Sequence, residues 1–327
     1  MKEFNGLVVG LGDWGSRVAR EYAYLAEEGA LGKIYLAEPK KEQLEKFKTM
    51  HKELIQKLGN KIKFIDIDVT KIDKATVSDI NVAHICVNNK FHYPIAKFLM
   101  ENGISVIIEK PVSESIEEAN ELIEIAKKNN VVAKAGLIFR FDNSIKKIKE
   151  IYDSKQLGKV YFMRFTWEFS RKPMENVDIV WDLTPHLIDI YSFFTGHNAA
   201  FVTGLKTQFR RNDKAELANV VLTNQANIKA ILEISWFSTA KTRTIEIFGE
   251  KKIIRADILA QTITLFETDD ILKSEQLQIV KNNTIREEAL NLIENAKTGK
   301  NTVNPIEIGV NETKLIDEIN RNINSIK

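Results

Sequence analysis

The chain has 327 residues, of which 44% are hydrophobic and 28% charged, and its formal net charge at pH 7 is +2. This length predicts two domains, and the composition suits ordinary cores under a soluble surface. The near-neutral charge gives no field for a polyanion, and the apolar runs are strand-sized, so nucleic-acid and membrane partners are excluded.

The N-terminus and the cysteine content predict a cytoplasmic location. Met1-Lys2-Glu3 runs almost directly into the first predicted strand and leaves no room for a signal peptide. Cys86 is the single cysteine, so no internal disulfide can form and a reducing compartment is the default. Cys86 lies in the apolar run 82–87, and we expect a buried core residue rather than a nucleophile.

A glycine-rich loop follows the first predicted strand, Leu7–Val9, and precedes a helical pattern that starts at Ser16. In a G-x-G-x-x-G loop the first glycine permits a tight turn, the second a close backbone approach to a pyrophosphate, and the third close helix packing. The helix N-terminus adds partial positive charge. A plain turn is the alternative, but the context favours dinucleotide binding by Gly10, Gly12, Asp13, Trp14 and Gly15.

Glu38 ends the second predicted strand, 34–37. A carboxylate here can accept hydrogen bonds from ribose hydroxyls and repels a 2′-phosphate, which favours NAD over NADP. Lys40 and Lys41 follow at once and could offset this repulsion, or they could simply be solvated residues at the start of a helix. NAD is therefore the predicted cofactor, and NADP stays open as an alternative.

Strand-sized runs alternate with helical stretches up to residue 136, with strands expected at 62–67, 82–87, 106–108 and 131–135. This rhythm predicts a doubly wound parallel sheet, a Rossmann domain at 1–136, whose ligand binds at the carboxyl ends of the strands. Asn88 and Asn89 lie at that edge and are candidate cofactor contacts, unless their side chains only stabilise a turn.

Glu109-Lys110-Pro111 follows the strand at 106–108. The Lys110 ammonium would emerge from apolar surroundings, where it can bind a substrate hydroxyl and stabilise negative charge as the proton leaves. Glu109 and Lys110 are also expected to contact the cofactor. Pro111 fixes the backbone and permits a cis peptide bond before it.

Runs that alternate apolar and polar residues dominate positions 159–280 and predict a large, mainly antiparallel sheet. Helical stretches are expected at 144–152, 182–191, 285–296 and 307–323. We therefore predict a second α/β domain at 137–327 for substrate binding and oligomerisation. Its uncovered sheet face predicts a homodimer or homotetramer, through residues such as Trp236 and Phe237.

Asp182 and His186 stand four residues apart and would share one face of a helix. Histidine can accept a proton near neutral pH, and a carboxylate can orient its ring or raise its pKa. Alternatively, Asp182 caps a helix that begins at Leu183 and His186 faces solvent. No cysteine or second histidine stands at ligand spacing, so no metal is predicted. Asp189 is either a substrate contact or only a helix charge.

Four motifs together resemble, in order and spacing, the Gfo/Idh/MocA oxidoreductases. They are Gly10–Gly15, Glu109-Lys110-Pro111, the segment 136–141 that ends in Arg140-Phe141, and Trp181–Asp189. The resemblance spans nearly the whole chain and is specific only as a combination. It implies an N-terminal Rossmann domain and a C-terminal α/β domain whose large open sheet is covered by helices on one face.

The same resemblance implies reversible oxidation of a sugar or cyclitol hydroxyl with NAD(P). It places Lys110, Asp182 and His186 at the catalytic and substrate-binding positions, with His186 as the acid/base, and Arg140 in a segment that contacts substrate or cofactor. Two features differ from many relatives, which carry glycines before the aspartate and another glycine two residues before the histidine. Here the segment 176–180 contains no glycine, and Thr184 stands in place of the second. The form Trp-Asp-Leu-x-Pro-His looks more like members that act on nucleotide sugars, and Arg171 and Lys172 could bind a diphosphate or carboxylate.

The predicted function is hydride transfer between NAD(P) and a secondary alcohol of a sugar, nucleotide sugar or cyclitol. His186, assisted by Lys110 and Asp182, would take the hydroxyl proton. One alternative is a non-catalytic NAD(P)-binding sensor or regulatory protein, which has no need of this acid/base set. The other is a reductase of a non-sugar carbonyl or imine, which would use the same set.

Overall fold

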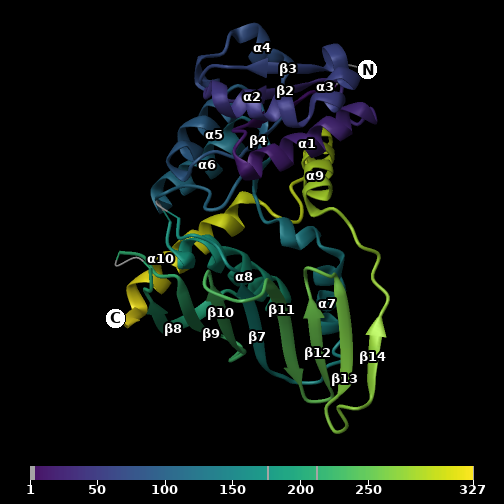
Figure 1. The fold of residues 1–327 in the computed structure, drawn as a ribbon, viewed down its shortest axis with the longest axis vertical. Coiled ribbons are helices and arrows are strands. Elements are labelled where there is room, and N and C mark those ends of the chain that lie inside the picture. The colour runs from purple at the N-terminus through teal and green to yellow at the C-terminus, as the bar shows by residue number, and fades with distance from the viewer. Residues whose placement is uncertain (1–3, 175–176, 211–212, 327) are drawn as a thin grey trace. The chain divides into compact units, whose positions relative to one another are not determined.

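The computed structural model describes residues 4–174, 177–210 and 213–326. It contains two compact units (Figure 1). The first unit consists of two segments, the chain up to Ile138 and Asn283–Thr313. The second consists of Phe139–Asn282 and the residues from Lys314 on. Two sequence expectations fall partly outside the described residues. The expectation of no signal peptide involves Met1–Glu3, and the difference from relatives in glycine content involves Asn176.

The first unit is built on a six-stranded parallel sheet in the order β3-β2-β1-β4-β5-β6. Its strands are β1 (Gly6–Val9), β2 (Ile34–Ala37), β3 (Ile62–Ile65), β4 (Val82–Ile85), β5 (Ser105–Ile108) and β6 (Ala133–Ala135). Every residue of β1, β2, β4 and β5 is buried, as the continuous apolar runs require when helices cover both faces. The predicted doubly wound sheet is therefore confirmed.

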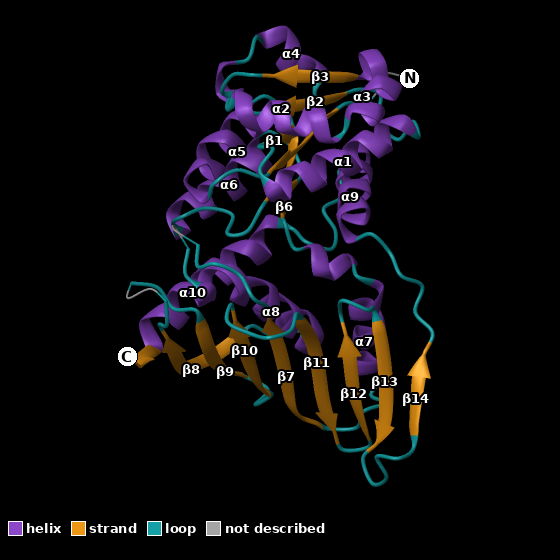
Figure 2. Cartoon of the chain, viewed as in Figure 1, coloured by secondary structure: helices purple, strands orange, loops and turns teal. Residues whose placement is uncertain are grey.

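Helices cover both faces of this sheet (Figure 2). Leu7 and Val9 join the core cluster that includes residues of α5 and α6, while Val8 joins the cluster that includes α1 and α9, because successive side chains of a strand point to opposite faces. The helices are α1 (Asp13–Glu27), α2 (Lys41–Met50), α3 (Lys52–Leu58), α4 (Lys74–Asp79), α5 (His92–Glu101), α6 (Ile116–Lys128) and α9 (Thr284–Thr298).

Helix α9 belongs to the first unit, whereas the sequence analysis assigned the whole of 137–327 to the second domain. Ala289, Leu292 and Ile293 of α9 are buried in the same cluster as Val8, and the helix contacts α1, β4 and β5. The first residues of α10 (Ile306–Asn322) also pack with this unit, through Ile306 and Val310. The first domain predicted from the sequence, 1–136, therefore omits Asn283–Thr313, which belongs to the first unit.

The second unit contains a nine-stranded sheet within the described residues, in the order β14-β13-β12-β11-β7-β10-β9-β8-β15. The pairs β7·β10 and β8·β15 are parallel and the other pairs antiparallel, which confirms a mainly antiparallel sheet. The strands are β7 (Val160–Glu168), β8 (Ala199–Thr207), β9 (Leu217–Asn224), β10 (Lys229–Ser235), β11 (Thr242–Gly249), β12 (Lys252–Asp257), β13 (Thr262–Glu267), β14 (Ser274–Leu277) and β15 (Ile323–Ile326).

Strand β7 shows how one face of this sheet is covered. Met163, Phe165 and Trp167 are buried, while the alternating Arg164 and Thr166 are half-exposed. Helices α7 (Asn143–Asp153) and α8 (Ile179–Thr195) pack against strands of the sheet and against each other. The covered face is therefore the one that carries the large apolar side chains.

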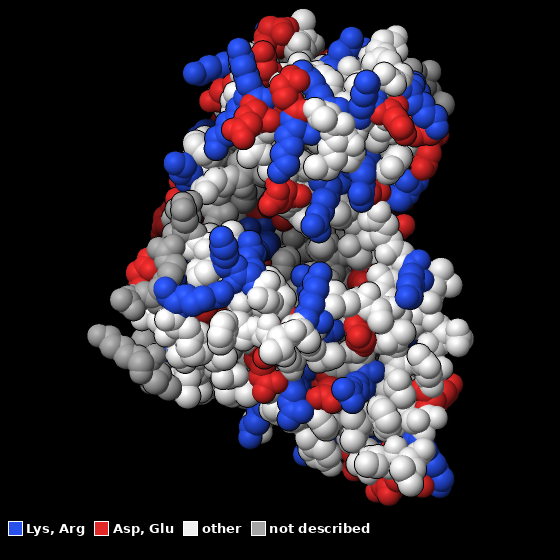
Figure 3. Space-filling model, in the orientation of Figure 1, with Lys and Arg blue, Asp and Glu red and all other residues white. Residues whose placement is uncertain are grey.

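The residues predicted for self-association differ in exposure. The Trp236 side chain is completely buried within its own unit, so it cannot form part of an exposed face. Phe237 is 59% exposed. No helix in the described ranges is long and apolar enough to cross a membrane. On the face in Figure 3, acidic and basic side chains are interspersed over the first unit, in keeping with the small net charge.

Candidate active site

The glycine-rich loop is shaped by backbone contacts that exclude side chains. Gly10 has φ +91°, and a Cβ there would lie 2.6 Å from the Cys86 carbonyl oxygen. A Cβ on Gly15 would lie 2.0 Å from the carbonyl oxygen of Gly10. At Gly12 the space is open to 4 Å, directly before α1 begins. The loop therefore presents bare backbone at a helix N-terminus, which suits a pyrophosphate.

Glu38 is held against this loop. Its buried carboxylate accepts hydrogen bonds from the backbone N–H groups of Leu11, at 2.9 Å, and Lys40, at 3.0 Å. A carboxylate has about four lone-pair positions, so it can accept ribose hydroxyls as well. The side chains of Lys40 and Lys41 are exposed, as the solvated alternative predicts.

Glu109 links the glycine-rich loop to the strand β4. Its Oε1 accepts hydrogen bonds from the Trp14 indole, at 2.5 Å, and from His84 Nε2, at 3.1 Å. Burial alone would raise the pKa of the Glu109 carboxyl, but the bonds to His84 and Trp14 and the charge of Lys110 outweigh it and lower the pKa. Glu109 is therefore a buried carboxylate beside Lys110, and His84 is a partner that the sequence analysis missed.

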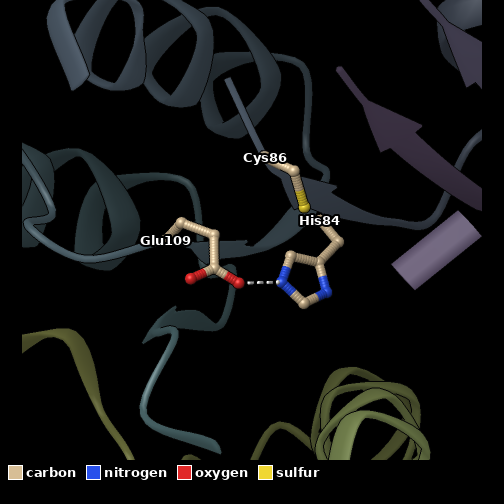
Figure 4. A group of neighbouring side chains, drawn as sticks. All are labelled: His84, Cys86 and Glu109. Atoms are coloured by element: carbon tan, nitrogen blue, oxygen red, sulfur yellow. Dashed lines mark hydrogen bonds and ion pairs between the residues drawn. The ribbon is translucent and has the colours of Figure 1, made fainter. Parts of the chain in front are cut away.

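The ligand-type atoms of His84, Cys86 and Glu109 all lie within 4.8 Å of one another (Figure 4). A metal would require a thiolate. Burial, together with the charges of Glu109 and Glu288, raises the pKa of the Cys86 thiol well above its ordinary value. Since Glu109 Oε1 already accepts two protein hydrogen bonds, we interpret the group as a hydrogen-bonded cluster, and the absence of a metal stays a prediction.

Lys110 stands two residues after the end of β5 and is half-buried, and the Lys110–Pro111 peptide bond is cis. Asn88 is exposed and makes no side-chain capping bond to the short helix Asn89–Phe91, so the structure does not support the alternative in which it stabilises the turn. The roles proposed for these side chains toward cofactor stay predictions.

His92 joins the Lys110 loop to the Asn88 turn and was not identified from the sequence. Its ring is buried, with Nδ1 2.7 Å from the Pro111 carbonyl oxygen and Nε2 3.1 Å from that of Val87. Burial lowers the pKa of His92, although both carbonyls act against it. A neutral imidazole carries one N–H, so it donates to one carbonyl at a time.

In the second unit, Asp182 and His186 both lie on α8, four residues apart as predicted. The helix begins earlier than expected, because Asp178 is its N-cap and accepts from the Val180 N–H at 2.7 Å. The alternative in which Asp182 caps a helix starting at Leu183 is therefore wrong. Asp182 Oδ2 instead accepts from the Trp236 indole at 3.3 Å and lies 3.5 Å from the Arg171 guanidinium.

The His186 ring is packed against aromatic side chains. Its centroid lies 5.1 Å from Phe139, edge-on, and 5.7 Å from Trp167. The Arg243 guanidinium lies over both of these aromatic rings, 4.6 Å from the Trp167 centroid and 5.7 Å from the Phe139 centroid. These rings restrict the orientation of His186, which contradicts the alternative of a histidine that merely faces solvent.

Arg140 and Asp189 form a buried ion pair. Arg140 Nε donates to Asp189 Oδ1 at 2.7 Å, and the guanidinium also lies over the Phe193 ring, 5.1 Å from its centroid. Their side chains are 10% and 2% exposed. Asp189 is therefore no exposed helix charge, and the predicted contact of Arg140 with substrate or cofactor stays a prediction.

The candidate residues are thus divided between the units. The glycine-rich loop, Glu38, the Asn88 turn and Lys110 belong to the first, while Arg140, Asp182 and His186 belong to the second.

Comparison with known families bears on both units. Residues 4–137 match an oxidoreductase family with an NAD-binding Rossmann fold, and residues 145–255 match the C-terminal domain of the same family. The chain belongs to the Gfo/Idh/MocA oxidoreductase family. The predicted resemblance is thereby confirmed over both domains.

Two curated members of the Gfo/Idh/MocA family are similar in sequence. The UDP-N-acetylglucosamine 3-dehydrogenase of Acidithiobacillus ferrooxidans is 24% identical over 193 residues, which cover 59% of this chain and 60% of that protein. The myo-inositol 2-dehydrogenase of Thermotoga maritima is 25% identical over 203 residues, with coverages of 59% and 60%. The matched region thus spans about three fifths of each relative.

Solved structures of this family share the fold over nearly the full chain. That of the Acidithiobacillus ferrooxidans enzyme superposes with a TM-score of 0.82 at 19% identity, covering 99% of this chain and 98% of that one. A variant of a 3-ketoreductase from Actinomadura kijaniata, solved with TDP-benzene and NADP, gives 0.79 at 14% identity, covering 99% of both chains. These likenesses establish the fold.

Proposed function

We propose that this family member is an NAD(P)-dependent dehydrogenase that transfers hydride between the cofactor and a secondary alcohol of a sugar, nucleotide sugar or cyclitol. One observation carries the proposal: an oriented Asp182–His186 pair occurs in the same chain as a glycine loop whose backbone excludes side chains. Relatives named as UDP-N-acetylglucosamine and myo-inositol dehydrogenases support this class of substrate.

In the proposed mechanism His186 accepts the hydroxyl proton and Asp182, on the same helix face, stabilises the imidazolium that results. Lys110 donates a hydrogen bond to the same oxygen and stabilises its developing negative charge. We assign substrate contact to Lys110, Arg140, Asp182 and His186. Bound NAD(P) supplies the hydride acceptor or donor.

Within the first unit we propose cofactor contacts along the glycine loop and the carboxyl ends of the strands. Glu38 supports NAD over NADP, because its buried carboxylate is fixed beside the loop and repels a 2′-phosphate. NADP stays an alternative. The full set is Gly10, Gly12, Asp13, Trp14, Gly15, Glu38, Asn88, Asn89, Glu109 and Lys110.

The decisive experiment offers NAD and NADP separately with UDP-sugars, free sugars and inositols, and follows reduced nicotinamide by absorbance. Lys110→Ala should lower turnover about 10²- to 10⁴-fold, while NAD affinity stays nearly constant because Lys110 is only one of the ten proposed cofactor contacts. Lys128→Ala, at an exposed helix position, is the matched control. Wild-type turnover in Lys110→Ala would remove this lysine from the mechanism.

Silence across the panel despite measurable NAD binding would favour the sensor or regulatory alternative. Turnover of non-sugar carbonyls or imines alone would favour the reductase alternative. The oriented Asp182–His186 pair supports catalysis over sensing, because binding a dinucleotide does not require it.

We also propose a cytoplasmic homodimer or homotetramer that assembles through the sheet of the second unit. The single cysteine supports the location. Phe237, exposed and 5.5 Å from the ring of the exposed Phe209, supports an apolar contact surface. Light scattering of the wild type and Phe237→Ser tests this, and a monomeric wild type would contradict it.

A further inference from the structure

His84 is a completely buried histidine that the proposed mechanism does not use. It lies in β4, and its Nε2 is 3.1 Å from Glu109 Oε1 (Figure 4). A carboxylate only accepts hydrogen bonds, so Nε2 carries a proton and donates. The other ring nitrogen, Nδ1, is buried and has no hydrogen-bond partner among the described residues. Because an apolar side chain would avoid the cost of burying that nitrogen, the bond to Glu109 is what a histidine adds at this position.

Three segments of the first unit fix the Glu109 carboxylate. Oε1 accepts from the Trp14 indole, at 2.5 Å, as well as from His84. On the other side, a Cβ on Gly136 would lie 3.0 Å from Oε2 and from the carboxyl carbon, so the absence of a side chain at Gly136 provides the space for the carboxylate. Groups from α1, from β4 and from the segment after β6 thus enclose a side chain that is only 11% exposed.

The Glu109 carboxylate joins two parts of the proposed cofactor site. Trp14 belongs to the glycine-rich loop, and Lys110 is the residue after Glu109. A carboxylate has about four lone-pair positions, so Glu109 can accept a donor from the cofactor besides the two that Oε1 already accepts. The bonds from His84 and Trp14 hold it in one orientation before the cofactor arrives, which lowers the entropic cost of binding.

We propose that His84 is a positioning residue for cofactor binding, which fixes the Glu109 carboxylate and, through it, the Trp14 side of the glycine-rich loop. The inference rests on the cofactor contacts of the proposed function and adds a residue that acts through another side chain. His84 acts from the interior of the first unit, since its ring is buried and its Nε2 is already bonded to Glu109.

The groups around Glu109 give this role a signature in pH. Burial raises the pKa of the Glu109 carboxyl, and the bond to His84 is the largest of the effects that outweigh burial and lower the pKa. Lys110 acts in the same direction, and His92 of α5 is a further titratable neighbour. Cys86 of β4 stays a thiol, because burial raises its pKa. Loss of the His84 bond should therefore raise the pKa of Glu109, so that its carboxyl takes up a proton as the pH falls.

Two further ionisable groups lie on the α1 and α9 sides of His84. The Tyr22 ring of α1 meets the imidazole edge-on, with the centroids 6.0 Å apart, and burial raises the pKa of its hydroxyl well above the ordinary value. Glu288 of α9 adds negative charge that raises the pKa of Tyr22 further. The pKa of Glu109 is lowered instead by His84, Trp14 and Lys110. A change in the pH behaviour of Glu109 in a His84 variant therefore reports on the bond between these two residues.

The test measures NAD binding without substrate. His84→Phe keeps a buried ring and removes the N–H, whereas the amide of His84→Gln can donate to the same carboxylate. In His84→Phe the dissociation constant of NAD should rise about threefold at about pH 8 and about tenfold or more at about pH 5.5, where Glu109 is partly protonated. In the wild type and in His84→Gln it should change less than about threefold over this range.

Two further variants support this measurement. His51→Phe is the matched control, since His51 belongs to the same unit and its ring packs on Phe47 at 4.6 Å, and it should behave as the wild type. His84→Leu should behave as His84→Phe, and it carries the test if phenylalanine is too large for the site. Thermal unfolding at each pH confirms that each variant is folded.

A second readout follows a bond that His84 does not itself make. The Trp14 indole N–H gives a proton resonance in a nitrogen-correlated spectrum, which is assigned by its loss in Trp14→Phe. In His84→Phe this resonance should move between about pH 8 and about pH 5.5, because Glu109 takes up a proton in this range. In the wild type it should stay in place.

Equal NAD affinities in His84→Phe and the wild type at both pH values would overturn the inference and leave the proposed dehydrogenase unaffected. A loss of affinity that does not depend on pH, with the Trp14 resonance fixed, would also overturn it, because such a loss indicates only a packing defect. The expected pH-dependent loss of NAD affinity, without turnover of any substrate by the wild type, would retain the positioning role and reject the proposed function.

Discussion

The glycine-rich loop of the first unit and the α8 face of the second unit are held by different means. Backbone atoms set the loop, since added carbon atoms at Gly10 or Gly15 would meet carbonyl oxygens at 2.6 and 2.0 Å. On α8 the geometry depends on side chains, because Trp236 and Arg171 hold Asp182 while Phe139 and Trp167 hold His186. Single substitutions of the loop glycines should therefore have abrupt effects, whereas single substitutions of the residues that support Asp182 and His186 should have graded effects.

The largest effect is expected at the acid/base position itself. His186→Gln removes the proton acceptor and should lower kcat by about 10²- to 10⁴-fold. NAD affinity should stay nearly constant, because the residues proposed to bind NAD belong to the first unit. Steady-state kinetics and NAD titration measure both quantities. A decrease in kcat below about tenfold would exclude His186 as the acid/base.

The next largest effect is expected from adding a side chain to a glycine of the loop. Gly15→Ala should destabilise the fold by about 1–3 kcal/mol or more, because its Cβ overlaps the Gly10 carbonyl, and should abolish NAD binding. Gly12→Ala meets only open space, so it should weaken NAD binding while the Tm stays unchanged. Thermal unfolding and NAD titration of both variants separate the two glycines, and equal Tm losses would argue against backbone control.

A smaller effect is expected from a residue that supports Asp182. Trp236→Phe keeps an aromatic ring but removes the indole N–H that donates to the carboxylate, and should lower kcat/KM about threefold to tenfold. The effect stays moderate because Arg171 still pairs with Asp182. If kcat/KM is unchanged across the pH profile, the indole does not position Asp182.

A separate effect, on stability rather than on catalysis, is expected at a buried side chain of the first unit. Lys134 is completely buried and donates to the Thr302 carbonyl and Asn304 Oδ1, and burial lowers its pKa to about 8. Between about pH 8 and the ordinary lysine pKa of about 10.4 the unfolded chain holds a proton that the folded chain lacks, so wild-type stability rises with pH.

Lys134→Met removes this contribution, so the stability of the variant relative to wild type should fall by up to about 1.4 kcal/mol per pH unit across that window. Urea unfolding of both proteins at pH 8, 9 and 10 measures the difference. A constant difference would mean that Lys134 keeps its proton over this range.

Features set by local backbone rules could be predicted from the sequence. The glycine loop, the buried strand segments of the first unit and the helical position of Asp182 and His186 each depend on residues close in sequence. In contrast, contacts between distant segments could not be predicted: Arg140 with Asp189, His84 with Glu109, and His92 with Pro111. Periodicity states which face of an element is buried but does not state its partner.

Trp236 illustrates the same limit. Its place at the end of an alternating strand indicated an exposed sheet face, but the indole is buried and bonds to Asp182 on a helix 54 residues earlier. The capping residue was also misjudged, because both Asp178 and Asp182 are good N-caps and only the real helix start at Ile179 distinguishes them. The assignment of α9 failed because an amphipathic helix can cover either sheet.

The return of α9 to the first unit makes both units discontinuous in the chain: Phe139–Asn282 separates the two parts of the first unit, and Asn283–Thr313 separates the two parts of the second. A fragment that stops at Ile138 would leave Val8, Val82 and Ile107 without Ala289, Leu292 and Ile293, the apolar partners that α9 provides. Such a fragment should aggregate. An autonomous version of the first unit requires residues 283–313 to be rejoined after residue 138 by a short linker, in a spliced chain that omits the intervening segment.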